Sequence, residues 1–214
     1  MIAIAKSLAE NPTVAVAAER AVVADKGRQI GLLGGTFNPI HIGHLIVAEQ
    51  VLIKLHLDEI WFIPTNIPPL KDAPTVSVQD RTNMLELATQ DNPHFQVKLF
   101  ELQRGGVSYT VDTLRYLRKT QPANHYYLIM GSDQVNALGK WKEPTQLAQM
   151  ATLVGVQRAG YPQQAPLPMI WVDVPAVELS STAIRQAIAS GGSIRYLVPA
   201  AVCNYIQKKG LYHD

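Results

Sequence analysis

The amino-acid sequence predicts an α/β fold in which helices cover both faces of a doubly wound parallel sheet. Short apolar runs alternate with longer segments whose apolar residues recur at helical spacing. This alternation is typical of parallel strands joined by right-handed helical crossovers. The chain has 214 residues, of which 47% are hydrophobic and 17% charged, and these values fit a single globular domain with a sizeable core.

Residues 1–28 precede the alternating pattern and are predicted to form an N-terminal extension. They are rich in Ala and Val, and the segment DKGRQ breaks the pattern before the first clear strand. We expect one helix or two short ones here, joined near Gly27 to a domain that spans residues 29–214. The sequence does not indicate what this extension does.

The expected strands are short apolar runs that end at glycine, proline or polar residues. They are residues 29–33, 59–64, 95–102, 125–131, 152–158 and 169–174. A proline-rich loop of residues 65–77 follows the second strand and is long enough to suggest a function of its own. In sheets of this kind, ligands bind beyond the carboxyl ends of the strands.

The expected helices carry apolar residues three and four positions apart. They are residues 43–55, 78–90, 108–120, 144–150, 180–191 and 198–210, with further short helices leading to Trp141. Ser77 and Asp80 resemble a capping box at the start of the second helix. Ser108 or Thr110 is expected to start the third helix, and the last two helices each end at a glycine.

Composition and charge exclude several classes of protein. The net charge of +2 is too small to argue for a nucleic-acid partner, and no apolar run approaches the ~20 residues of a membrane span. The first residues lack a basic region and soon reach Glu10 and Pro12, so no signal peptide is expected. Cys203 is the only cysteine, which favours a reducing, cytoplasmic location.

The segment GLLGGTFNPIHIGH, residues 31–44, leaves the first strand through two glycines. Gly34 and Gly35 would let the backbone approach a bulky anionic ligand. Asn38 and Pro39 suit the start of a helix, by capping and by a preset backbone angle. The N–H groups and the dipole of such a start favour phosphate.

His41 and His44 lie three residues apart and can therefore face one anion together. The other histidines, His56, His94, His125 and His213, are scattered and supply no third ligand for a metal ion. An ordinary capped helix with no ligand is the alternative. The two glycines and two histidines together favour phosphate.

Two further polar clusters follow expected strands. In LSSTAIR, residues 179–185, Ser180, Ser181 and Thr182 can cap a helix, and Arg185 lies one turn further on. Together they could bind a second anion, although a plain serine cap followed by a solvated arginine explains the same residues.

The cluster MGSD follows the expected strand at residues 125–131. Gly131 and Asp133 could contact a ribose there, or Asp133 could simply cap a helix. The nearby Trp141 is either a core residue or a flat surface for a heteroaromatic ring.

These clusters, in this order, resemble those of the bacterial nicotinate-nucleotide adenylyltransferases, a family of the nucleotidyltransferases with a His-x-Gly-His signature. The resemblance covers residues 29–213 and rests on GGTFNPIHIGH, PTNIPPLK, SYTVDTL, MGSD, Trp141, VQR ending at Arg158, LSSTAIR and the closing VPAAVCNYIQKKGLY. It implies a Rossmann-like nucleotidyltransferase domain that transfers AMP from ATP to nicotinate mononucleotide, giving nicotinate adenine dinucleotide and pyrophosphate.

The resemblance also implies roles for individual residues. The catalytic residues would be His41, His44 and Arg185, and no protein metal ligand is expected because Mg²⁺ would be held mainly by ATP phosphates and water. The residues expected to bind ATP are Gly34, Gly35, Thr36, Phe37, Gly131, Asp133, Ser181 and Thr182. The residues expected to bind the mononucleotide are Asn38, Lys71, Ser108, Tyr109, Thr110 and Trp141.

The chain departs from the family pattern at two positions. Asn38 stands where the family often has Asp, and Leu70 stands where it usually has His. Because of these departures, a nucleotide-binding sensor without catalytic activity remains an alternative interpretation. Phosphopantetheine adenylyltransferase is a second alternative, but it lacks SYTVDTL. Aminoacyl-tRNA synthetases share the HIGH letters, yet this chain shows neither their Lys-rich second motif nor a tRNA-binding region. The sequence leaves open whether the chain forms a homo-oligomer.

Overall fold

The computed structural model describes residues 27–70, 74, 76–157, 165–175 and 177–213. Its centre is a parallel sheet of six strands in the order β3-β2-β1-β4-β5-β6. The chain first builds the sheet outward from β1 to β3 and then returns to add β4 on the other side of β1. The topological switch point therefore lies between β1 and β4, which confirms the predicted doubly wound, Rossmann-like sheet.

Each strand forms where an apolar run was expected. The strands are β1 (Gln29–Gly35), β2 (Glu59–Pro64), β3 (Phe95–Val97), β4 (His125–Gly131), β5 (Thr152–Gln157) and β6 (Ile170–Asp173). β1 and β4 are buried on both sides because they lie in the middle of the sheet. Alternate residues of β1 contribute to two separate cores, Ile30 and Leu32 to one and Leu33 to the other.

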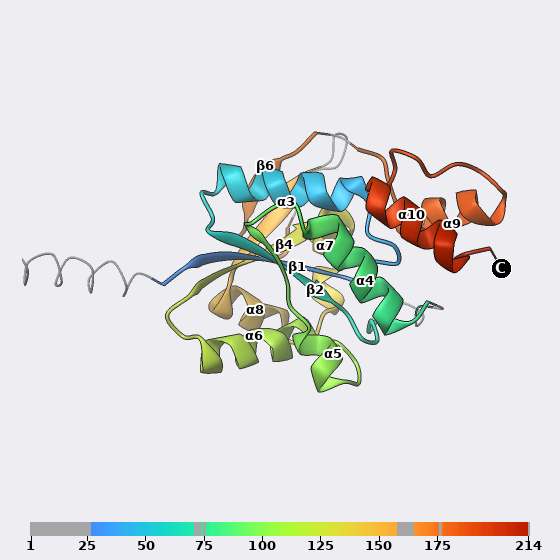
Figure 1. Ribbon diagram of the computed structural model, residues 1–214. Coiled ribbons are helices and arrows are strands. Elements are labelled where there is room, and N and C mark those ends of the chain that lie inside the picture. Colours follow the sequence, from blue (N-terminus) through green and yellow to red (C-terminus); the bar gives the residue numbers. More distant parts are fainter. Residues whose placement is uncertain (1–26, 71–73, 75, 158–164, 176, 214) are drawn as a thin grey trace, which may run out of the picture.

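Helices cover both faces of the sheet (Figure 1). Four of them pack their apolar residues into one core: α3 (Ile42–Lys54), α4 (Val78–Thr89), α9 (Ser181–Ala189) and α10 (Ala200–Lys209). On the other face lie α5 (Phe100–Arg104), α6 (Thr110–Thr120), α7 (Ser132–Ala137) and α8 (Pro144–Met150), with a short 3₁₀ helix, η1 (Leu138–Lys140). Helices α9 and α10 lie at the carboxyl ends of the strands, at the right of Figure 1.

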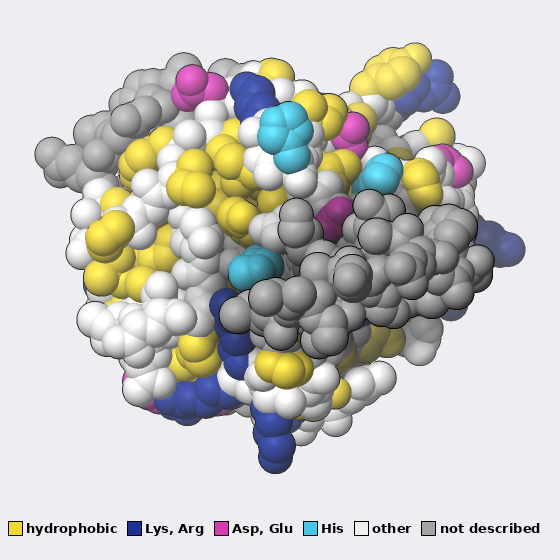
Figure 2. All heavy atoms as spheres, turned by 90° about the vertical axis from the view of Figure 1, so that its left-hand side faces the viewer, with side chains coloured by type: hydrophobic (Ala, Val, Ile, Leu, Met, Phe, Trp, Pro, Cys, Tyr) yellow, Lys and Arg dark blue, Asp and Glu magenta, His cyan; other side chains and the backbone are white. Residues whose placement is uncertain are grey.

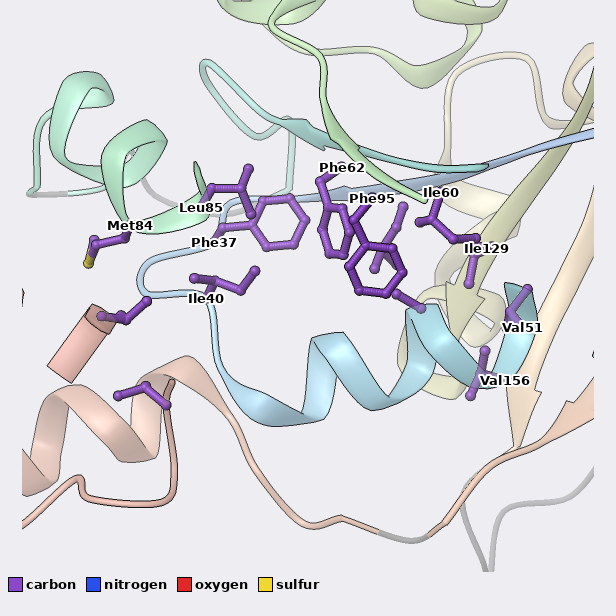
Figure 3. Packing of buried hydrophobic residues seen from close by; sticks show 14 of the residues in the cluster. Phe37, Ile40, Val51, Ile60, Phe62, Met84, Leu85, Phe95, Ile129 and Val156 are labelled. Atoms are coloured by element: carbon purple, nitrogen blue, oxygen red, sulfur yellow. The ribbon is translucent and has the colours of Figure 1, made fainter. Parts of the chain in front are cut away.

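The larger core reaches from β3 to the loop that follows β1. Three aromatic rings, Phe37, Phe62 and Phe95, lie between the sheet and α3 (Figure 3). The centroids of Phe37 and Phe62 are 5.9 Å apart, and those of Phe62 and Phe95 are 5.2 Å apart. Such pairs stabilise a core beyond the area they bury. Phe37 thus anchors the loop after β1 to the centre of the domain.

One predicted strand is longer than the structure shows, and one predicted helix start is now decided. The strand expected over residues 95–102 ends at Val97, because the chain turns into α5 at Phe100. Of the two residues expected to start the next helix, Thr110 is confirmed: α6 begins there with Tyr109 as its N-cap, and the Ser108 hydroxyl accepts a hydrogen bond from the Asn66 N–H instead.

Other sequence signals are confirmed. Ser77 caps α4 by accepting a hydrogen bond from the Asp80 N–H, and α10 ends at Gly210, which has a left-handed backbone. The predicted extension lies outside the described residues apart from Gly27 and Arg28. Within the described parts of the chain, no helix is long and apolar enough to cross a membrane.

Candidate active site

Two adjoining cavities open at the carboxyl ends of β1 and β4. The first has a volume of about 550 Å³ and the second about 870 Å³. Both are lined by the same central residues, Gly34, Gly35, Thr36, Asp133 and Gln134. A molecule in one cavity would therefore meet a molecule in the other over the end of β1. This is the position where doubly wound sheets bind ligands.

The predicted site residues divide between the two cavities. The first is lined by Gly34, Gly35, Thr36, Phe37, His41, His44, Gly131, Asp133, Ser181, Thr182 and Arg185. The second is lined by Ser108, Tyr109, Thr110 and Trp141, in addition to the shared Gly34, Gly35, Thr36 and Asp133. Asn38 was expected beside the last group but lies in the first cavity instead. Lys71 and Arg158 lie outside the described residues.

The loop from Thr36 to His41 forms part of the wall of the first cavity. The expectation that Asn38 and Pro39 start a helix is wrong, because α3 begins at Ile42 with His41 as its N-cap. Asn38 is only 7% exposed: its side-chain oxygen accepts a hydrogen bond from the Tyr212 hydroxyl at 2.7 Å. Its polar groups therefore join the loop to other parts of the chain.

The two histidines lie together at the first turn of α3. Their rings stack with centroids 3.7 Å apart, and both line the first cavity, His41 being the more deeply buried of the two. Nδ1 of His44 accepts a hydrogen bond from the His41 N–H at 3.2 Å. A neutral imidazole that accepts at Nδ1 carries its proton on Nε2, so this contact makes Nε2 the donor nitrogen of neutral His44.

Gly43 leaves space for the ring of the first histidine. A Cβ atom at Gly43 would lie 3.1 Å from two atoms of the His41 ring, closer than an ordinary van der Waals contact. The glycine of the signature therefore makes room for the first histidine. Sequence reasoning had assigned Gly43 no role.

The start of α9 forms the opposite wall of the first cavity. Ser180 caps the helix by accepting a hydrogen bond from the Ala183 N–H, as the sequence predicted. The Ser181 hydroxyl donates to the Pro39 carbonyl at 2.8 Å, so it also fastens α9 to the loop. Arg185 donates from Nη1 to the Asn38 carbonyl at 2.8 Å and from Nη2 to the Thr182 hydroxyl at 3.3 Å. This guanidinium gives the first cavity a positive charge.

Arg81 is a buried cation that sequence reasoning missed. Only 1% of it is exposed, and Nη1 donates to the carbonyls of Thr36 (2.8 Å) and Thr65 (2.9 Å). Arg81 thereby holds together the ends of β1 and β2, and burial lowers its pKa. Its sequence context, a polar stretch of α4, gives no signal that distinguishes it from a surface arginine.

The second cavity is more apolar and has an aromatic rim. Trp141 follows η1 and is half-buried against the core of that face. The Lys142 ammonium lies 4.7 Å from the centroid of the Tyr109 ring, within the range of a cation–π contact. Flat apolar walls with cationic groups at the edge suit an aromatic ring that carries an acidic substituent.

Glu101 is a second buried charge that the sequence did not reveal. It is 5% exposed and lines the second cavity, where Oε1 accepts a hydrogen bond from the Thr113 hydroxyl at 2.8 Å. Oε2 has no hydrogen-bond partner among the described residues. Burial raises the pKa of Glu101, although the Thr113 hydroxyl acts in the opposite direction.

The described residues contain no group of three or more His, Cys, Asp or Glu side chains that could hold a metal ion. On the opposite side of the molecule, where β1 enters the sheet, Figure 2 shows histidine side chains that lie apart from one another. Asp133 lines both cavities, and among the described residues it is the one carboxylate in the lining of the first cavity.

Comparison with known proteins gives consistent matches. Residues 32–187 match the family model "Cytidylyltransferase-like". A Lactiplantibacillus plantarum protein named "Probable nicotinate-nucleotide adenylyltransferase" is 45% identical over 205 residues, which cover 95% of this chain and 97% of that protein. A protein of the same name from Enterococcus faecalis is 47% identical over 188 residues, 87% of this chain and 86% of that protein.

Solved structures support the fold. The Plasmodium falciparum nicotinic acid mononucleotide adenylyltransferase complexed with NaAD aligns with a TM-score of 0.74 at 20% identity, over 87% of this chain and 98% of that one. The same enzyme complexed with APC aligns with a TM-score of 0.72 at 19% identity, with the same coverage.

Proposed function

Because the chain belongs to the nicotinate-nucleotide adenylyltransferases within the cytidylyltransferase-like family, we propose that it transfers AMP from ATP to nicotinate mononucleotide. The products are nicotinate adenine dinucleotide and pyrophosphate, so the reaction is a step of NAD biosynthesis. The observation that carries the proposal is the pair of adjoining cavities that share the end of β1. One suits a polyanion and the other a ring with an acidic substituent.

The reaction needs no nucleophile from the protein. The phosphate oxygen of the mononucleotide attacks the α-phosphorus of ATP, the bond to the β-phosphate oxygen breaks, and pyrophosphate leaves with the electron pair. Catalysis then depends on holding two anions in line and on stabilising the charge that develops. Residues shared by both cavities, Gly34 to Thr36 and Asp133, stand where the two substrates would meet.

His44 and Arg185 would act on the ATP phosphates. Nε2–H of His44 would donate to the α-phosphate, where negative charge increases in the transition state. Arg185, with Ser181 and Thr182 at the start of α9, would hold the β- and γ-phosphates until they leave as pyrophosphate. The buried His41 fixes the orientation of His44 through its N–H.

Mg²⁺ would accompany ATP in this site. It would neutralise part of the phosphate charge and make pyrophosphate a better leaving group. A set of donors with one carboxylate, Asp133, fits an ion that is held mainly by phosphates and water. The same set does not fit a metal ion that the protein holds by itself.

In the second cavity, Trp141 would stack on the pyridinium ring of nicotinate mononucleotide. The turn at Ser108, Tyr109 and Thr110 would accept its carboxylate at the start of α6. The free N–H groups and the dipole of a helix start favour such an anion. Lys71 is proposed on the resemblance alone, and Asn38 is better assigned to the first cavity than to the mononucleotide.

A pyrophosphate-release assay tests the proposal. The protein with Mg²⁺ and ATP is given nicotinate mononucleotide, phosphopantetheine or no acceptor, and the dinucleotide product is identified by mass. We expect release only with the mononucleotide. Release with phosphopantetheine would support the related adenylyltransferase instead. ATP binding without release for either acceptor would support a sensor and overturn the proposal.

A further inference from the structure

After α10 the chain contacts the loop that follows β1, through Tyr212 and Asn38. After α10, Gly210 and Tyr212 both have left-handed backbones, with φ angles of 60° and 68°. A left-handed backbone is strained for a residue such as tyrosine, so other contacts must hold Tyr212 in place. Its ring packs against the larger core, and its hydroxyl donates to Oδ1 of Asn38 across 174 residues of sequence.

The Tyr212 hydroxyl is the donor of this hydrogen bond. Burial raises its pKa well above the ordinary value of 10.0, although the charges of Arg185 and Arg81 act in the opposite direction. A protonated hydroxyl donates, and the amide oxygen of Asn38 accepts. Position 38 therefore needs a side chain with an oxygen acceptor, which Asn supplies as well as Asp does.

The loop that Tyr212 contacts is also held by three side chains from two helices. Arg81 of α4 binds the Thr36 carbonyl, and Ser181 and Arg185 of α9 bind the carbonyls of Pro39 and Asn38. All of these contacts reach the backbone. The bond from Tyr212 differs because it holds the Asn38 side chain.

We propose that Tyr212 is a positioning residue of the phosphate cavity: by holding the Asn38 side chain, it fixes the carbonyl against which the Arg185 guanidinium is oriented. The proposal rests on the proposed function for the identity of the ligand, a nucleoside triphosphate. It gives a role to the segment Gly-Leu-Tyr, residues 210–212, which takes no part in the proposed reaction.

The arrangement predicts an effect on one substrate only. Asn38 and Arg185 line the first cavity and not the second. Loss of the Tyr212 hydroxyl should therefore weaken ATP binding while the KM for the mononucleotide stays the same. A purely structural role would lower the stability of the protein and would not separate the two substrates.

Tyr212→Phe is the test, and Tyr205→Phe is its matched control. Tyr205 lies on α10 and its hydroxyl also takes part in partly buried hydrogen bonds, to Asp80 and from Asn83, but none of these three residues lines either cavity. The probe is α,β-methylene ATP with Mg²⁺, whose dissociation constant is measured by calorimetry. We expect an increase of about tenfold in Tyr212→Phe and less than about twofold in Tyr205→Phe.

Asn38→Ala supplies an independent measurement because it removes the other partner of the same bond. It should weaken binding of the analogue about as much as Tyr212→Phe, and the double variant should be no weaker than either single one. Additive effects, or equal losses in both tyrosine variants, would overturn the proposal. Binding of the analogue needs no acceptor, so failure of the proposed reaction would leave this test intact.

Discussion

At the scale of single residues, the imidazole of His44 is oriented by its neighbours. The His41 ring stacks on it, and the His41 N–H donates a hydrogen bond to its Nδ1. The Phe37 ring lies edge-on to it, with the two ring centroids 5.1 Å apart. Preorganised donors of this kind contribute to catalysis because they need no rearrangement when charge develops. The sequence indicated both histidines but not the tautomer, which depends on this local contact.

His44→Ala should lower kcat by about 10²- to 10³-fold, the usual effect of removing one donor to a developing oxyanion. Folding should survive, since loss of a side chain at a helix start costs at most about 2 kcal/mol. His125→Ala is the control, because His125 is exposed at the other end of the sheet, where β4 begins. Steady-state kinetics and a denaturation curve decide, and near-normal turnover of a folded His44→Ala protein would contradict the role.

Glu101 gives a prediction about pH. Because burial raises its pKa above 4.5, the folded protein binds the proton more tightly than the unfolded chain does. Wild-type stability should therefore fall as pH rises from about 4.5 through the folded pKa, and Glu101→Gln should not share this fall. Urea denaturation at pH 5 and pH 8 should show a larger advantage of the glutamine variant at pH 8. An equal difference in unfolding free energy between wild type and Glu101→Gln at both pH values would mean that burial does not raise the pKa of this carboxyl.

At the scale of elements, the sequence predicted the strands and most helices because each carries its own periodic pattern. It could not place Asn38, because the side chain of Asn38 contacts Tyr212 and not the neighbouring helix. Arg81 and Glu101 were missed for the same reason: nothing in their sequence neighbours shows that they are buried. Ser108 was one of two residues expected to start α6, yet its hydroxyl accepts a hydrogen bond from the Asn66 N–H in the proline-rich loop. Contacts between distant segments are decided by packing, which local patterns do not record.

The start of α6 predicts which mononucleotide is preferred. Helix N–H groups favour a carboxylate over an amide by about 0.3–2 kcal/mol, and an amide N–H₂ facing N–H donors costs about 1–3 kcal/mol more. The kcat/KM for nicotinate mononucleotide should therefore be at least about a hundredfold higher than the kcat/KM for nicotinamide mononucleotide. Comparing the two substrates measures this preference, and equal use of both would remove the argument.

Trp141→Ala separates stacking from the carboxylate contact. If the indole stacks on the pyridinium ring, the variant should raise the KM for both mononucleotides and keep the preference between them. Unchanged kinetics would show that Trp141 only packs against the core of its face of the sheet.

At the scale of the whole molecule, the switch point between β1 and β4 explains why residues from 34 to 185 meet at one site. Each strand of the sheet points its carboxyl end to the same edge, so loops far apart in sequence become neighbours. The two cavities adjoin over β1, and this is the geometry that a direct transfer between two bound substrates requires.

The configuration at the α-phosphorus tests this account most directly. ATP with one oxygen of its α-phosphate replaced by sulfur in a single configuration is reacted with nicotinate mononucleotide, and the configuration of the dinucleotide product is determined. One in-line attack between adjoining cavities inverts the phosphorus, so the account predicts inversion. Retention would require two displacements through a covalent intermediate on the protein and would contradict direct transfer.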